Sequence, residues 1–266
     1  MRVRTITAFF FVAVVLASIL LSVYLFAIFF MLLSVYCLSE FYRIIADSAG
    51  TPQRLLGLSA GAALFGLYTG YCLGWVPLNY LMLIVPLVSA IFIAPLYKKQ
   101  EKPFIGIAYT LLGIVYVILP FASFLSLGFL SDVYDYRIPL GFILILWAND
   151  TGAYLVGKLF GKHRLFERIS PKKTWEGFVG GVLLALITSM VLAYYFPQLA
   201  QWQWLVMALI IALFGTFGDL VESMLKRSQQ VKDSGAVLPG HGGLLDRFDG
   251  LLLAGPAVLA FLLTVL

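Results

Sequence analysis

The segment Gln201–Arg227 reads QWQWLVMALIIALFGTFGDLVESMLKR, an apolar run that passes directly into charged residues. A helix needs about 20 predominantly apolar residues to cross the hydrocarbon core of a bilayer. Asp219 and Glu222 are three residues apart, and Ser223 follows Asp219 by four, so a helix places all three on one face. The segment therefore predicts a membrane-spanning helix with polar chemistry at one end.

The composition extends this interpretation to the whole chain. Of its 266 residues, 62% are hydrophobic and only 12% are charged, whereas about 25% of the residues of a soluble domain are charged. The apolar runs are continuous, which favours helices over the alternating strands of a barrel. We therefore expect an all-α polytopic membrane protein.

Nine apolar segments are candidate spans. The first two are separated only around Ser18–Ser22, which predicts either a tight hairpin or one long helix. We expect N-terminal spans within residues 1–138 and a C-terminal catalytic region at 139–266, with loops at 158–174 and 226–243. The nine segments are 5–20, 22–45, 54–74, 78–97, 103–122, 139–157, 175–196, 201–225 and 244–265.

The positive charges predict the orientation. If the N-terminus is cytoplasmic and the first two segments form a hairpin, all of the 18 Lys and Arg residues except Arg137 fall on the cytoplasmic side. A single long first helix would reverse every later loop and destroy this agreement. The two long basic loops and the polar residues beside them are therefore expected to face the cytoplasm.

Four carboxylates lie inside or at the edge of apolar segments: Asp150, Asp219, Asp246 and Asp249. A charge at the centre of a bilayer costs about 3 kcal/mol. Each could instead lie in the headgroup layer, and a helix N-terminus would favour Asp246 and Asp249 there. Their convergence from three segments favours a shared hard cation. We expect Asp219, Asp246 and Asp249 to hold it, with Asp150 a weaker candidate.

In the sequence, basic residues lie between the acidic pair Asp219 and Glu222 and the acidic pair Asp246 and Asp249. Lys226, Arg227 and Lys232 would bind phosphate, although each could equally be a simple topology determinant. Ser223 would coordinate a metal or phosphate, or bond a backbone carbonyl of its own helix. Carboxylates for a cation next to bases for phosphate are typical of metal-assisted phosphoryl chemistry.

A second polar cluster spans Ser170–Gly177. We expect Ser170 to be a helix N-cap with Pro171 at the first helical position. Lys172 and Lys173 would then lie in the first turn and bind an anion, or they form a basic loop on an anionic membrane surface. His241, in a Gly-rich turn, would be a base, a phosphate donor or only a turn residue.

These residues resemble a known signature. The pattern Ser223-x-Leu-Lys-Arg227, Lys232-Asp-x-Gly235 and Leu238-Pro-x-His-Gly-Gly-Leu-x-Asp-Arg-x-Asp249 is similar to that of the phosphatidate cytidylyltransferase family, also called CDP-diacylglycerol synthases. Asn149–Tyr154 and Ser170–Gly177 also resemble segments of that family. The first 140 residues match only as apolar spans.

The resemblance implies the reaction CTP + phosphatidate → CDP-diacylglycerol + diphosphate, with Mg²⁺ as cofactor and a possible second cation. It implies an enzyme of phospholipid biosynthesis in a bacterial cell (inner) membrane, with no nucleic-acid partner, and it is compatible with a homodimer. The expected catalytic residues are Asp219, Lys226, Arg227, Asp246 and Asp249. The expected phosphate-binding residues are Lys172, Lys173, Ser223, Lys226, Arg227, Lys232, His241 and Arg247.

Three other functions remain open from the residues alone. A transporter also carries intramembrane carboxylates, but it should place them near the midplane, and no inverted repeat is visible. A CDP-alcohol phosphatidyltransferase would show Asp-Gly-x-x-Ala-Arg, whereas Asp249-Gly250 is followed by Leu251. The density of acids and bases between Asp219 and Asp249 disfavours a non-catalytic lipid-binding or scaffold protein.

Overall fold

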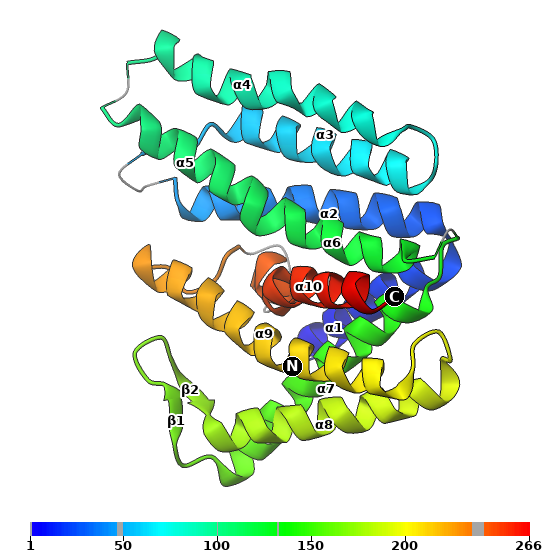
Figure 1. Ribbon diagram of the computed structural model, residues 1–266. Helices are drawn as coiled ribbons and strands as arrows, with labels where there is room; N and C mark the ends of the chain where they lie inside the picture. Colours follow the sequence, from blue (N-terminus) through cyan, green and yellow to red (C-terminus); the bar gives the residue numbers. More distant parts are fainter. Residues whose placement is uncertain (1, 47–49, 100, 132, 236–241) are drawn as a thin grey trace. The chain divides into compact units, whose positions relative to one another are not determined.

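The computed structural model describes residues 2–46, 50–99, 101–131, 133–235 and 242–266 (Figure 1). Within these ranges, eight helices are long and apolar enough to cross a membrane, and α1 adds the shorter apolar stretch Phe9–Leu21. The predicted all-α polytopic membrane protein is thereby confirmed. The chain divides into two units, Met1–Leu125 with Ser228–Arg247, and Ser126–Arg227 with Phe248–Leu266.

The observed elements follow the predicted segments in order. Short 3₁₀ segments flank α4 at Leu78–Ile84 and Ala94–Tyr97, and a π-helical turn, Ile114–Ile118, joins α5 to α6. The strands are β1, Arg164–Phe166, and β2, Ser170–Thr174. The helices are α1 Arg2–Leu21, α2 Val23–Ile44, α3 Arg54–Cys72, α4 Val85–Ile93, α5 Pro103–Gly113, α6 Leu119–Ser126, α7 Arg137–Phe160, α8 Trp175–Tyr195, α9 Gln201–Ser228 and α10 Leu245–Val265.

In the first unit, α2 packs against α1, α3 and α5. Ser22 ends α1 and caps α2, because its side chain accepts a hydrogen bond from the Tyr24 N–H. Residues 7–14 of α1 and 29–36 of α2 line one apolar cavity, so the two helices run back on each other. The structure thus confirms a hairpin here, which the charge pattern required.

Buried polar contacts fix the helices of this unit against each other. The Tyr42 hydroxyl donates to the carbonyl oxygen of Thr110 at 2.6 Å, which ties α2 to α5. The Gln53 side chain donates to the carbonyl oxygen of Ile91 at 2.6 Å, which ties the start of α3 to α4. Because hydrocarbon offers no alternative partner, such bonds help to define helix positions inside a membrane.

In the second unit, glycines allow α7 and α8 to approach closely. A Cβ on Gly152 of α7 would overlap the carbonyl oxygen of Gly180 in α8, and one on Gly177 would overlap that of Ala153. Gly177 and Gly181 are four residues apart and form a small-residue stripe on α8. Stripes of this kind are typical of tightly packed membrane helices.

A similar contact brings α9 to α10 within the same unit. A Cβ on Gly218 would overlap the main-chain carbonyl oxygen of Asp249 and crowd Gly250. Leu146 of α7 covers Gly215 and Gly250 from the side. The backbone of α10 at Asp249 is therefore pressed against the turn of α9 that carries Asp219.

The region before α8 differs from the prediction. Ser170 is not a helix N-cap, because Ser170–Thr174 forms β2, which pairs antiparallel with β1. Thr174 caps α8 instead, and its hydroxyl accepts a hydrogen bond from the Gly177 N–H at 3.1 Å. Pro171 is tolerated in β2 because, among the residues that the structure describes, this strand pairs with β1 alone and lies at the edge of the sheet. Lys172 and Lys173 thus lie on a strand, outside any helical first turn.

Candidate functional site

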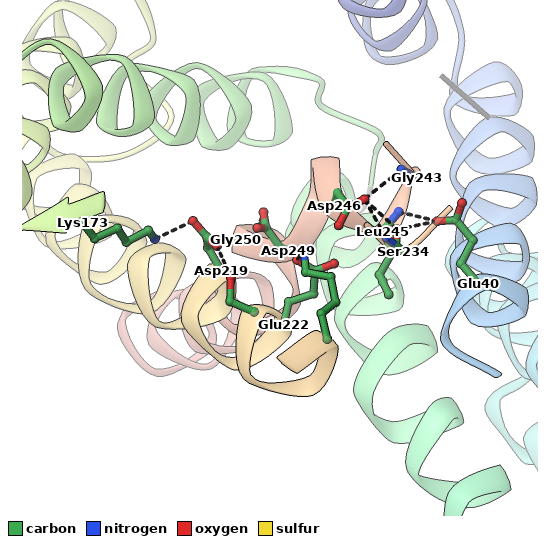
Figure 2. A network of polar contacts seen from close by, with 12 residues as sticks. Glu40, Lys173, Asp219, Glu222, Ser234, Gly243, Leu245, Asp246, Asp249 and Gly250 are labelled. Carbon is green, nitrogen blue, oxygen red and sulfur yellow. Dashed lines mark hydrogen bonds and ion pairs between the residues drawn. The ribbon is translucent and has the colours of Figure 1, made fainter. Parts of the chain in front are cut away.

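Three carboxylates converge in the second unit. One oxygen each from Asp219 and Glu222 of α9 and from Asp249 of α10 lies within 4.8 Å of the others (Figure 2). The spacing within α9 puts its two acids on one face, and the Gly218 contact brings α10 to that face. Like charges this close repel each other strongly unless positive charge lies between or beside them.

Asp150 of α7 adds a fourth negative charge. Asp150, Asp219 and Glu222 are all close enough to Asp249 to repel its carboxylate electrostatically. Asp150 itself is exposed, whereas Glu222 is completely buried. The second unit therefore gathers acidic residues from α7, α9 and α10, as the sequence predicted for three of its four members.

The donor set fits a hard divalent cation. Mg²⁺ prefers oxygen ligands and is commonly held by one or two carboxylates together with substrate phosphates. Asp219, Glu222 and Asp249 offer three carboxylates within a few ångströms of each other. The residues present therefore suit the cofactor that the sequence resemblance implies.

Each acid of α9 also has a partner on its own helix. The Lys226 ammonium lies 2.8 Å from the Glu222 Oε2 atom, and both side chains are buried. The Ser223 hydroxyl donates to Asp219 Oδ1 at 3.2 Å. Lys226 and Ser223, both predicted to bind phosphate, thus lie beside the acidic cluster and orient its carboxylates.

Lys173 connects the β-hairpin to α9. Its Nζ atom lies 2.5 Å from Asp219 Oδ2 and donates to the carbonyl oxygen of Thr216 at 3.4 Å (Figure 2). The side chains of Lys173 and Asp219 are both partly exposed. A base and an acid therefore meet at the surface of the site, where a bound phosphate could reach the ammonium group.

A cavity of about 490 Å³ opens beside this ion pair. It combines acidic, basic and apolar walls, as expected for a pocket that takes a charged ligand. Asp150 and Asp219 supply its negative charge, and three lysines supply positive charge. Its walls include Asn149, Asp150, Tyr154, Lys158, Ser170, Lys172, Lys173, Thr216 and Asp219.

Glu176, in the first turn of α8, holds the hairpin that carries the lysines. Its carboxylate accepts from the backbone N–H groups of Lys162 and His163 and lies 2.6 Å from His163 Nδ1. A carboxylate is favoured at this helix N-terminus by the helix dipole. The chain before β1 is thereby fastened to α8 next to the cavity.

Asp246 lies in the first unit, where Ser234 and Gly243 donate hydrogen bonds to its carboxylate. Its Oδ2 atom accepts from the N–H groups of Ser234 and Gly243 at 3.0 and 2.8 Å and from the Ser234 hydroxyl at 2.9 Å. Its position in the first turn of α10 agrees with the predicted helix start. The carboxylate is therefore firmly oriented by the residues of the signature.

The remaining predicted residues are more exposed. Lys172, Arg227, Lys232 and Arg247 are exposed, and among these only Lys172 lines the cavity of the second unit. His241 lies outside the described residues. Exposed bases at the ends of spans are compatible with phosphate binding and with the topological role that was left open.

Several site residues escaped the sequence prediction. Glu222 was noted on the face of Asp219 but was not included among the metal ligands, although its three-residue spacing was the available signal. Tyr154, Lys158 and Thr216 line the cavity, yet in the sequence they are ordinary members of apolar or basic segments. Their role depends on how α7, α9 and the hairpin fold together.

Comparison with known proteins now adds to this geometry. The profile described as the cytidylyltransferase family matches residues 2–265. A protein named phosphatidate cytidylyltransferase from Staphylococcus haemolyticus is 34% identical over 96% of each chain. One of the same name from Staphylococcus aureus is 35% identical over the same shares, and one from Staphylococcus saprophyticus is 41% identical over 63% of this chain and 64% of the relative.

The match extends over nearly the whole chain, including the N-terminal spans that carried no signature. It confirms the resemblance drawn from the signature residues. It also decides between the alternatives, since a transporter or a scaffold protein would not be expected to match this profile from end to end. The chain belongs to the cytidylyltransferase family and is a nucleotidyltransferase embedded in the membrane.

Proposed function

We propose that this protein transfers the cytidylyl group of CTP to phosphatidate, yielding CDP-diacylglycerol and diphosphate for phospholipid biosynthesis. One observation carries the proposal: Asp219, Glu222 and Asp249 converge beside a lysine-lined cavity. Support also comes from relatives named phosphatidate cytidylyltransferase that align over 96% of the chain. Asp249 of this cluster belongs to the signature, and Asp219 and Glu222 come just before its first residue, Ser223.

The chemistry requires alignment and charge neutralisation. The phosphate oxygen of phosphatidate attacks the α-phosphorus of CTP, and the bond between the α-phosphorus and the bridging oxygen to the β-phosphate breaks. Diphosphate leaves with that electron pair. Because the nucleophile is already an anion, no side chain needs to remove a proton. The protein must instead hold two anions in line, which is how phosphoryl transfer is usually catalysed.

Asp219, Glu222 and Asp249 would hold a divalent cation, with Asp150 nearby. Asp246, which lies in the first unit, stays a further ligand predicted from the sequence. When bound, Mg²⁺ would neutralise charge on the phosphates and stabilise the leaving group. Glu222 thereby joins the ligand set expected from the sequence. Lys226 and Ser223 would keep the carboxylates of α9 in position.

Lys172 and Lys173 would bind substrate phosphate from the cavity wall. Their ammonium groups would face the oxygens of the lipid phosphate or of the leaving diphosphate. Arg227, Lys232 and Arg247 would supply further positive charge, and His241 would be a further hydrogen-bond donor to phosphate. The acyl chains of phosphatidate would remain in the bilayer while its phosphate enters the site.

The positive charges of the loops favour a cytoplasmic active site. CTP is a soluble nucleotide, and a site at the cytoplasmic surface would receive it directly. In bacteria this corresponds to the cell (inner) membrane. A homodimer remains an expectation from the family resemblance, and size-exclusion chromatography with light scattering in detergent would test it.

The direct test uses purified protein in detergent with phosphatidate and labelled CTP. Product is followed by thin-layer chromatography at increasing Mg²⁺ and, as a control, after addition of EDTA. We expect CDP-diacylglycerol to appear only with the divalent cation and diphosphate to be released in equal amount. A folded sample that forms no product with any divalent cation would overturn the proposal.

A further inference from the structure

A single acidic residue lies deep in α2 of the first unit. Glu40 is completely buried among the apolar residues of a membrane span. A buried carboxylate is costly unless hydrogen bonds or charges compensate it. Glu40 has no role in the mechanism proposed above, and its position therefore requires another explanation.

Its partners come from the signature segment at the other end of the sequence. Glu40 Oε2 accepts a hydrogen bond from the Leu245 N–H at 2.8 Å and one from the Ser234 hydroxyl at 3.2 Å (Figure 2). Leu245 is the first residue of α10. Glu40 thus contacts the chain at two points: at Ser234, and at the start of α10, the helix that carries Asp246.

The contact continues to Asp246. The Ser234 hydroxyl lies 2.9 Å from Asp246 Oδ2 as well as 3.2 Å from Glu40, and the Ser234 N–H donates to the same Asp246 oxygen. The Gly243 N–H also donates to that oxygen, at 2.8 Å. Glu40, Ser234 and Asp246 therefore form one connected network. Glu40 is its buried carboxylate, and Asp246 is its partly exposed one.

The glycines of the signature are explained by this network. A Cβ on Gly235 would overlap Glu40 Oε1, and a Cβ on Gly243 would overlap Ser234 Oγ and both carboxylate oxygens of Glu40. Gly242 has a φ of 84°, and a Cβ there would crowd the Asp246 carboxylate. Glycine at these three positions leaves room for the carboxylates of Glu40 and Asp246 and for the Ser234 hydroxyl.

We propose that Glu40 is a positioning residue for cytidylyl transfer, which holds Ser234 and the start of α10 at Leu245 so that Asp246 is correctly oriented. The inference rests on the proposed function, in which Asp246 serves the cation and the phosphates. Glu40 acts through Ser234 and Leu245 and touches no substrate. An N-terminal span, which carries none of the signature, thereby contributes to the chemistry.

Experiments can distinguish this positioning role from a purely structural role of Glu40. Tyr42→Phe provides the matched control, because Tyr42 is also buried in α2 and its hydroxyl bonds Thr110, away from the signature segment. If Glu40 has only a structural role, substitutions of Glu40 and Tyr42→Phe should each lower Tm and leave kcat unchanged. A positioning role predicts that only the Glu40 substitutions change kcat and the Mg²⁺ dependence.

The variants are Glu40→Ala, Glu40→Gln and Ser234→Ala, each purified in detergent next to Tyr42→Phe. We expect kcat to fall about 10–100-fold in Glu40→Ala, as for residues that orient metal ligands, with a higher Mg²⁺ concentration at half-maximal rate. Glu40→Gln keeps an oxygen that can accept from the Leu245 N–H, and we expect a smaller loss. If Glu40→Ala does not fold, the comparison of Glu40→Gln with Tyr42→Phe still tests the proposal.

Hydrogen exchange separates this inference from the proposed function, because it needs no turnover. We expect Glu40→Ala and Glu40→Gln to speed exchange in peptides that contain Ser234 and Gly243–Leu245, and Tyr42→Phe to leave those peptides unchanged. Unchanged exchange there would overturn the anchoring by Glu40, even if wild type proves inactive with CTP and phosphatidate. Faster exchange with the kcat and Mg²⁺ dependence of Tyr42→Phe would overturn the positioning role.

Discussion

Asp219, Glu222 and their neighbours show how single side chains share charge in the second unit. Asp219 is paired with Lys173 and Ser223, and Glu222 with Lys226. The Glu222–Lys226 pair is buried, where loss of one partner leaves a costly uncompensated charge. The Asp219–Lys173 pair is partly exposed and adds little stability. In the proposed function, Lys173 would exchange this partner for a substrate phosphate.

Lys173→Met should therefore impair catalysis more than stability. The substitution keeps most of the length of the side chain and removes the charge that faces Asp219 and the cavity. A hydrogen bond to a charged group contributes about 1.5–3 kcal/mol, so kcat/KM should fall about 10–100-fold. Steady-state kinetics with varied CTP and varied phosphatidate would measure the loss.

Lys162→Met is the control for this substitution, since Lys162 is exposed in the same basic loop and does not line the cavity. We expect it to retain kcat/KM within about twofold of the wild type. An equal loss in both variants would mean that general surface charge, and not the position of Lys173, supports the reaction.

Only some of these side chains could be identified as candidate site residues from the sequence. Asp219, Asp249 and Lys173 could be predicted because acids and bases stand out in apolar segments. Glu40 stands out equally, yet nothing local shows its role, because Ser234 lies 194 residues away. Contacts of this kind arise only when distant helices pack, and no spacing rule within one segment can reveal them.

The packing of α9 against α10 brings Asp249 close to Asp219. The backbone of α10 rests on Gly218 of α9 without an intervening side chain. Both helices can be predicted from their apolar length, but their contact depends on which face of each is glycine-rich. A displacement of about 1 Å can cost 10²-fold in rate when reacting groups must align.

Gly218→Ala should separate α9 from α10 and reduce the rate about 10²-fold or more. The added methyl group would overlap the carbonyl oxygen of Asp249 and could be accommodated only by backbone movement. Such overpacking typically costs about 1–3 kcal/mol of stability. Cytidylyl transfer and thermal unfolding of the purified variant would measure both effects.

Gly66→Ala tests whether helix glycines are generally sensitive. A Cβ there would have only the Met31 sulfur as a neighbour, at 4.0 Å. We expect wild-type activity and an unchanged or slightly higher Tm, because alanine favours helices. If Gly218→Ala behaved like Gly66→Ala, the close contact of α9 with α10 would not matter for the site.

Thr174→Ala should destabilise the start of α8. The Thr174 hydroxyl caps the helix by accepting from the Gly177 N–H, and loss of such a cap costs about 1 kcal/mol. Thr174→Ser keeps the hydroxyl and should retain the wild-type Tm. An equal loss of Tm in Thr174→Ser and Thr174→Ala would assign the stability to the methyl group and argue against the cap.

This cap shows where local sequence rules fail. Ser170-Pro171 has the composition of a helix start, and the prediction of an N-cap there was wrong by four residues. Thr174 is an equally good capping residue, and the pairing of β1 with β2 decides between the two. Strand pairing depends on the partner strand, whereas capping preference depends only on the local residue.

The pattern of spans describes the whole molecule, and it was predicted almost completely. Continuous apolar length determines each span because the bilayer requires about 20 residues. The hairpin of α1 and α2 followed from the loop charges and is confirmed by the break at Ser22. The orientation relative to the membrane is a prediction from the same charges and needs its own test.

Cysteine labelling in intact bacterial cells would test that orientation. Cys37 and Cys72 would be replaced by Ser, and single cysteines introduced as Arg164→Cys and Val133→Cys, both at exposed positions. We expect a membrane-impermeant maleimide to label Val133→Cys from outside the cytoplasmic membrane and Arg164→Cys only after permeabilisation. The reverse result would place the site on the outer face.

The central claim is that the acids of α9 and α10 form the metal centre of cytidylyl transfer, and Asp249→Asn tests it most directly. We would measure the rate of CDP-diacylglycerol formation by this variant at saturating Mg²⁺, next to Asp135→Asn as a control. The Asp135 carboxylate accepts a hydrogen bond from the Arg137 N–H at 2.9 Å and lies outside the acidic cluster. The account predicts a loss of about 10³-fold, from several kcal/mol of charge stabilisation, with Tm retained. Wild-type turnover by Asp249→Asn, at any Mg²⁺ concentration, would contradict it.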